Sequence, residues 1–144
     1  MRGFNFKFDK VLRVREIRED KALNRFQECR RKVSRVEKDL EKKKNKRKRI
    51  HEYIRNRNDI SPDFMTVVRR YLEINKEKID KLKVELTELR QKLEKEKQAY
   101  INCRKKREIM DKMKENNREE RVKELLSREQ KELDEIGQQI REVH

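Results

Sequence analysis

Few side chains in this sequence are of the types that carry out catalytic or metal chemistry. There are two cysteines, Cys29 and Cys103, and two histidines, His51 and His144. Their positions match no spacing that metal sites or nucleophilic catalysis use, and the sequence has no glycine-rich loop to hold a phosphate. We therefore expect a protein that is not an enzyme, that binds no cofactor or metal, and whose cysteines stay reduced in the cytosol.

Basic side chains are the other chemically distinctive feature. Residues 30–58 contain fourteen Lys or Arg and four Asp or Glu, a net charge of +10, in a chain whose net charge is +15. The densest part is the basic patch Lys42, Lys43, Lys44, Lys46, Arg47, Lys48 and Arg49. Three interpretations stay open: a solvated helix face, a docking surface for an acidic protein, or a surface for nucleic acid. Aromatic side chains that stack on bases are sparse there, so we expect no specific nucleic-acid recognition.

The composition excludes an ordinary globular core. Charged residues make up 51% of the chain and apolar residues 32%, with no tryptophan. Two glycines and one proline are too few to break the chain often, so it can run helical over long distances. No stretch approaches the roughly 20 apolar residues of a membrane span. We expect a soluble protein that is not inserted in a membrane.

Apolar residues recur at alternating spacings of four and three, the heptad pattern of a coiled coil. Ten of fourteen such positions between Phe8 and Ile54 are apolar. A second stripe, from Val68 to Met110, has ten apolar residues at thirteen positions. The pattern then loses its phase and resumes in a new register at Val122, Leu126, Leu133, Ile136, Ile140 and Val143.

Residues 56–63 separate the two stripes and read as a turn followed by a helix start. Ser61 can cap the next helix, Pro62 suits its first position, and Asp63 complements the positive helix terminus. We expect one all-α domain over residues 1–144, a long two-helix antiparallel coiled-coil hairpin with a C-terminal helical overhang. Its helices would span about residues 9–57 and 62–142, with the turn at about 58–61. The alternative is one long helix, broken at the turn, in a homodimer.

The hairpin predicts a register in which paired residue numbers add up to about 119. Helix 1 is then used up near residue 111, where the second stripe loses its phase, so the rest of helix 2 projects alone. Cys29 faces about residue 90, roughly 20 Å along the helix from Cys103, so we expect no disulfide between them. Lys43, Arg47 and Asn75 are polar positions in the stripes that meet near the turn, where such groups cost stability and fix register. Near the open end, Arg15, Glu19, Glu96 and Arg107 can pair in more than one way.

Both ends of the chain resemble the FliJ family of flagellar export proteins. Residues 4–16 read FNFKFDKVLRVRE, with alternating phenylalanines, then Val-Leu, then Arg-Glu, and residues 129–135 read EQKELDE, similar to the family's closing segment. The middle of the chain is generic coiled coil. Injectisome counterparts of FliJ share the architecture, but the phenylalanine-rich opening favours the flagellar branch.

The resemblance implies a non-enzymatic stalk of the type III export apparatus, similar to the central stalk of rotary ATPases. Its partners would be the hexameric flagellar export ATPase, a membrane export-gate protein and export chaperones, in the cytoplasm at the periphery of the inner-membrane export apparatus. The candidate ATPase-docking residues are Phe4, Phe6, Phe8 and Val11. The candidate gate-docking residues are Tyr53, Tyr71 and Phe64, with simple packing between the helices as the alternative. The family is less basic near Lys42, Lys46 and Arg49. The alternative functions are a nucleic-acid-binding basic coiled-coil module and the injectisome counterpart of the same stalk.

Overall fold

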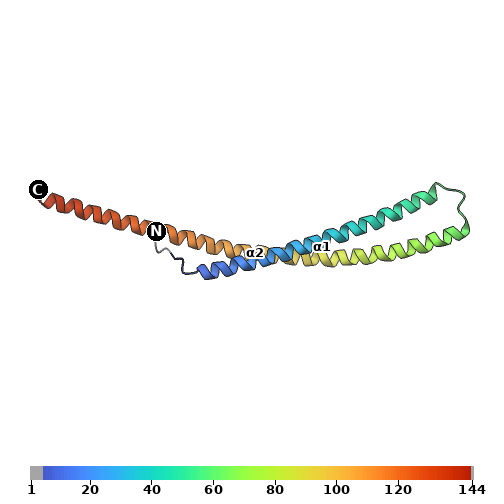
Figure 1. Ribbon diagram of the computed structural model, residues 1–144, viewed down its shortest axis with the longest axis horizontal. Coiled ribbons are helices and arrows are strands. Elements are labelled where there is room, and N and C mark those ends of the chain that lie inside the picture. Colours follow the sequence, from blue (N-terminus) through green and yellow to red (C-terminus); the bar gives the residue numbers. More distant parts are fainter. Residues whose placement is uncertain (1–4, 144) are drawn as a thin grey trace. The chain divides into compact units, whose positions relative to one another are not determined.

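Two helices account for nearly all of the computed structural model, which describes residues 5–143. Helix α1 spans Asp9–Arg55 and α2 spans Pro62–Val143 (Figure 1), and the described residues contain no strand. The expected all-α hairpin is confirmed, although α1 ends at Arg55 and not near residue 57. Over the residues that the structure describes, neither helix has a stretch that is both apolar enough and long enough to span a bilayer.

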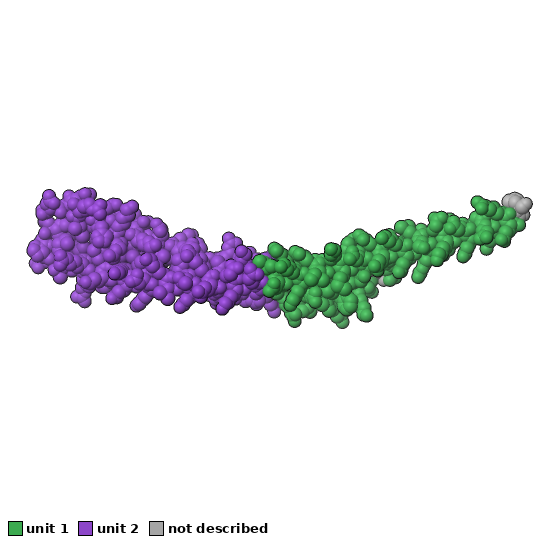
Figure 2. All heavy atoms as spheres, turned by 180° about the vertical axis from the view of Figure 1, so that it is seen from behind, with its two compact units in different colours: residues 1–20, 101–144 green, residues 21–100 purple. Residues whose placement is uncertain are grey.

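The chain divides into two compact units, coloured separately in Figure 2. One contains residues 21–100, and the other contains residues 1–20 and 101–144. Each unit takes residues from both helices, because α1 and α2 both continue across the boundary. That the two units fold as one domain stays a prediction.

The unit of residues 21–100 is held by the two heptad stripes. Its core consists of Val33, Leu40, Ile79 and Leu86, with Val36, Leu82, Leu89 and Leu93 packed around it. All eight lie on the predicted stripes, and burying each such side chain contributes about 1.5–3 kcal/mol. The register also agrees with the sequence. The Cys29 thiol lies 3.8 Å from the carbonyl oxygen of Leu89, and Arg47 Nη1 donates to the Leu72 carbonyl at 2.9 Å.

A polar layer interrupts this core near the turn. Asn75 is 5% exposed, and its Nδ2 donates to the Lys43 carbonyl at 3.4 Å. Lys43 itself turns to Asp39, with Nζ 2.8 Å from Oδ1. Among the described residues, Asn75 Oδ1 has no hydrogen-bond partner. The layer therefore costs stability while it favours one register of the two helices.

The other unit combines the start of α1 with the end of α2. Phe6, Leu12 and Met110 form its buried cluster, and Lys114 Nζ pairs with Asp9 Oδ1 at 3.0 Å. From Glu115 to Glu142 every residue is exposed, and α2 continues past the start of α1 (Figure 1). The predicted overhang is confirmed, and we call residues 115–143 the arm.

Candidate docking surfaces

The turn between the helices is built as its sequence predicts. Ser61 Oγ accepts a hydrogen bond from the Phe64 backbone N–H at 3.2 Å, and the Met65 N–H donates to the Ser61 carbonyl at 3.0 Å. Pro62 is the first residue of α2, where its missing N–H costs no helical bond. This capped start fixes where the side chains of the first two turns of α2 point.

A groove of about 530 Å³ lies beside this turn, between the last turns of α1 and the first turns of α2. We call it the tip groove. Its walls are formed by the aliphatic and aromatic side chains of Ile50, Tyr53, Ile54, Phe64, Val67, Val68 and Tyr71. Two basic residues, Lys46 and Arg49, lie beside them. Several of these side chains are partly exposed, with Val67 at 66%, while Val68 is buried between the helices.

All three candidate gate-docking residues line this groove. Tyr53 is 44% exposed, Tyr71 37% and Phe64 46%. Arg57 lies over the Tyr53 ring at 4.2 Å from its centroid, and Lys46 lies over the Tyr71 ring at 5.8 Å. These cation–π contacts hold the rings beside positive charge without covering them. The tyrosines are thus half-exposed groove walls, so packing between the helices does not fully account for them.

The seven residues of the basic patch do not all lie on one side of α1. Lys46 and Arg49 line the tip groove, whereas Lys44 and Lys48 are exposed outside it. Lys42 lines a smaller hollow of about 250 Å³ that shares Lys46 and Tyr71 with the groove. Lys43 and Arg47 are half-buried between the helices and bond to Asp39 and to the Leu72 carbonyl. Because a helix turns through about 100° per residue, consecutive basic residues point to different sides.

The sequence contains a second apolar stripe that predicts this groove and that the heptad count does not include. Phe64, Val67, Tyr71 and Ile74 follow one another at spacings of three, four and three. They form a second apolar stripe on α2 next to the one that packs against α1. Val67 is 66% exposed and Ile74 is 45% exposed. An apolar stripe beside the stripe that packs internally indicates a surface that faces something other than α1.

The candidate ATPase-docking residues differ in how far their side chains are exposed. Phe4 lies outside the described residues. Phe6 is 5% exposed and packs with Leu12 and Met110, so it supports the fold and does not offer a free docking surface. Phe8 and Val11 are exposed, and the Phe8 ring meets Phe6 edge-on with 5.7 Å between centroids. Val14 and Ile17, which were not among the candidates, are also exposed.

Arg107 settles the charge pairing near the open end. Its Nε and Nη2 donate to the two carboxylate oxygens of Glu19 at 2.6 and 3.2 Å, and its Nη1 donates to Asp111 at 2.8 Å. Hydrogen bonds to Glu19 first, and to Asp111 second, raise the pKa of Arg107 above its ordinary value. Arg15 instead bonds to the Lys106 carbonyl at 3.0 Å, and Glu96 pairs with Arg25 at 3.6 Å. The two-point contact with Glu19 ties α1 to α2 at this position.

The arm presents an apolar stripe that no part of the described chain covers. Val122, Leu126, Leu133, Ile136 and Ile140 are all exposed, as is Leu125 beside them. Residues 115–142 hold nine acidic and six basic side chains, a net charge of −3. The arm is therefore an amphipathic, slightly acidic helix with its apolar side in solvent, which is typical of a helix that packs against another molecule.

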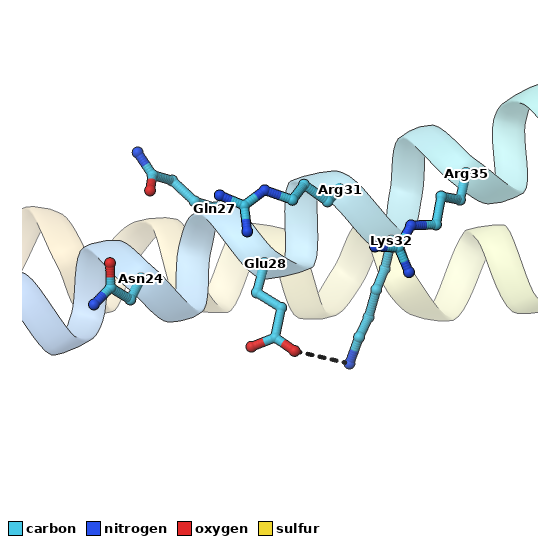
Figure 3. A pocket seen from close by; sticks show the side chains of 6 residues that line it. All are labelled: Asn24, Gln27, Glu28, Arg31, Lys32 and Arg35. Carbon is cyan, nitrogen blue, oxygen red and sulfur yellow. Dashed lines mark ion pairs between the residues drawn. The ribbon is translucent and has the colours of Figure 1, made fainter.

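A further hollow of about 320 Å³ lies along α1 (Figure 3). Asn24, Gln27, Glu28, Arg31, Lys32 and Arg35 line it, and Glu28 pairs with Lys32 at 3.8 Å. All six side chains are polar and come from one helix, so the hollow is a space between solvated side chains. In the part of the chain that the structure describes, no three His, Cys, Asp or Glu side chains gather to hold a metal ion.

Comparisons with known proteins agree with this architecture. The sequence model of the family described as "Flagellar FliJ protein" matches residues 4–141. The solved structure of CT670 from Chlamydia trachomatis, described there as a homologue of YscO, is similar with a TM-score of 0.68. It is 24% identical, and the match covers 99% of this chain and 98% of that one, which supports the fold. No curated protein sequence matches. Since the family match spans nearly its whole length, the chain belongs to the FliJ family, whose members are components of flagellar type III protein export.

Proposed function

We propose that this chain is the stalk of a flagellar export apparatus, a non-enzymatic link between a hexameric export ATPase and a membrane export-gate protein. The observation that supports the proposal best is that one FliJ-family chain carries two separate exposed apolar surfaces, the tip groove and the arm. Residues 72–114 of α2 separate them. A chain with two such surfaces can bind two partners at once without any chemistry of its own.

The tip groove is the surface proposed to dock on the export gate. It offers aromatic walls, which tend to carry much of the binding energy of protein interfaces, next to positive charge from Lys46 and Arg49. The basic stretch around it, with its net charge of +10, would speed the encounter with an acidic partner surface. The division of the basic patch over several sides of α1 argues against one continuous track for nucleic-acid phosphates.

The open end and the arm are proposed to enter the ATPase hexamer. There, two helices are joined by the Arg107–Glu19 contact and the buried Phe6, and the arm continues alone. Phe8 and Val11 stay exposed beside them and keep their proposed docking role. Export chaperones would be escorted by the same chain, at the cytoplasmic side of the inner-membrane apparatus.

The test separates the two surfaces by measuring binding to each partner with the same set of variants. Tyr53→Ala combined with Tyr71→Ala should lose binding to the gate protein and keep binding to the ATPase. Leu133→Ser combined with Ile136→Ser in the arm should do the reverse. Lys44→Gln combined with Lys48→Gln changes exposed residues outside the groove and serves as the control, with both partners bound. If either apolar pair affects both partners equally, or neither, the division of roles is wrong.

A further inference from the structure

The arm and the tip groove are complementary to each other as well as to outside partners. Both are apolar, both are exposed, and they carry opposite charge. The groove lies in the stretch with net charge +10, and the arm has net charge −3. The charged residues beside the arm's apolar stripe and beside the groove walls show the same difference in sign.

The charge within the arm's apolar stripe is negative. At about 100° per residue, Glu129 falls within the stripe formed by Leu126, Leu133 and Ile136, and Glu132 falls along its edge. Lys123 lies about as far from the centre of the stripe as Glu132 does, on the opposite side, and Arg128 and Lys131 lie further round the helix. The charge inside the apolar stripe is therefore the carboxylate of Glu129, in an arm whose net charge is −3.

The charges nearest the apolar walls of the tip groove are positive. Lys46 and Arg49 line it, and no acidic residue does. Both basic side chains are exposed, and neither has a carboxylate partner among the ion pairs of the described residues. A groove between two helices, apolar at its walls and basic beside them, suits an amphipathic helix that is apolar and acidic.

We propose that the arm of one copy of this chain lies in the tip groove of another copy. Within one chain, the groove and the arm belong to opposite ends of the sequence of α2, which is one helix from Pro62 to Val143. In this contact Leu126, Leu133 and Ile136 face the aromatic walls of the groove, and Glu129 and Glu132 face Lys46 and Arg49. Such a contact joins unlike surfaces, so it closes a pair of copies only if it is made twice, and otherwise builds chains.

Pairing between two arms is less favourable on the same residues. In a parallel pair, Glu129 of one copy meets Glu129 of the other in the centre of the interface. In the antiparallel register that matches Leu126 with Ile136, Glu132 lies next to Glu132 of the other copy. Like charges at such positions destabilise a helix pair, whereas the tip groove offers a cation for each carboxylate.

The consequence is a storage form of the free protein. Association would cover the two surfaces that the proposed function assigns to the ATPase and the gate. The inference does not rest on that function, because it concerns the purified chain alone. Copies of the chain would then compete with both partners, so the exposed apolar atoms would be covered until a partner displaces them.

The experiment is analytical ultracentrifugation of the full chain over a range of concentrations, in about 0.05 M and about 0.5 M salt. We expect association that weakens in high salt. Lys46→Glu with Arg49→Glu, or Glu129→Lys with Glu132→Lys, should each weaken it about tenfold or more, because two attractions become repulsions. A chain carrying all four substitutions should recover most of the lost affinity. Lys44→Glu with Lys48→Glu adds the same charge outside the groove and should have a much smaller effect.

Three results would overturn the proposal. One is a chain that stays monomeric at every concentration in low salt. Another is association that responds to the arm substitutions and not to the groove substitutions, as pairing between arms would. The third is a four-fold variant that fails to recover while its circular dichroism and thermal unfolding match those of the original chain. None of these results bears on binding to the ATPase or the gate, which is measured separately.

Discussion

Asn75 gives the sharpest test of how the polar layer near the turn works. It is 5% exposed, makes one long hydrogen bond of 3.4 Å to the Lys43 carbonyl, and leaves its Oδ1 without a partner among the described residues. An unpaired buried acceptor costs about 1–3 kcal/mol, and a buried leucine side chain contributes about 1.5–3 kcal/mol. The lost hydrogen bond offsets about 0.5–1.5 kcal/mol of this gain.

Asn75→Leu should therefore stabilise the protein. We expect a net gain of about 1–2 kcal/mol, because the new leucine packs next to the stem of Lys43 and not in a fully apolar layer. For a chain of this size that corresponds to a rise in Tm of roughly 3–7 °C. The measurement is thermal unfolding followed by the helix signal in circular dichroism.

The control is Asn45→Leu, at an exposed position of α1 in the same unit. It shares the difference in helix propensity between asparagine and leucine, about 0.5 kcal/mol, but buries nothing. The difference between the two variants isolates the buried position. If Asn75→Leu lowers Tm, the side chain is better satisfied than its contacts indicate, and the reasoning about the polar layer is wrong.

Four further predictions concern the rest of the molecule. Arg107→Met should lower the free energy of unfolding by about 1–2 kcal/mol, because it breaks the two-point contact with Glu19. The control Arg90→Met, at the exposed pair with Glu37, should change it by less than about 0.5 kcal/mol. Equal effects of the two variants in urea unfolding would contradict this prediction. Deleting residues 1–12 or 112–144 should abolish stimulation of the export ATPase while helix content stays high, and full stimulation by either truncated chain would count against the stalk role. The double variant Tyr53→Ala/Tyr71→Ala should impair motility and leave weak DNA retention unchanged. Under the nucleic-acid alternative, the tyrosine substitutions would have no effect, and replacing the seven residues of the basic patch with Gln would abolish function. Thiol titration should find two free cysteines and mass spectrometry no Cys29–Cys103 disulfide within a chain, since Cys29 faces Leu89.

The heptad stripes predict the fold well because the burial of their apolar side chains is what holds the two helices together. Val33, Leu40, Ile79 and Leu86 are apolar at a spacing that only a helix pair can bury together, and the capped turn at Ser61 sets the register. The arm follows from the same count, because α1 has too few residues to cover the end of α2.

The docking surfaces are less accessible to this reasoning. The tip groove is lined in part by Phe64, Val67 and Tyr71, which belong to a second apolar stripe that the heptad count does not follow. Phe6 was expected to be free for docking, but it packs against Met110, which lies more than a hundred residues away in the sequence. The partner of Arg107 was likewise undetermined, since Arg15, Glu19, Glu96 and Arg107 can pair in more than one way on spacing alone. The structure shows that Arg107 binds Glu19 and, in addition, Asp111.

The stalk role is tested most directly by titrating the purified hexameric flagellar export ATPase with this chain and following ATP hydrolysis. We predict that the rate rises and saturates with the full chain. It should not rise with the variant Leu133→Ser/Ile136→Ser, whose circular dichroism should match that of the original chain. It should rise normally with Tyr53→Ala/Tyr71→Ala, because the tip groove is assigned to the other partner. An ATPase rate that the full chain leaves unchanged, or that the arm variant raises as much as the full chain does, would contradict the account.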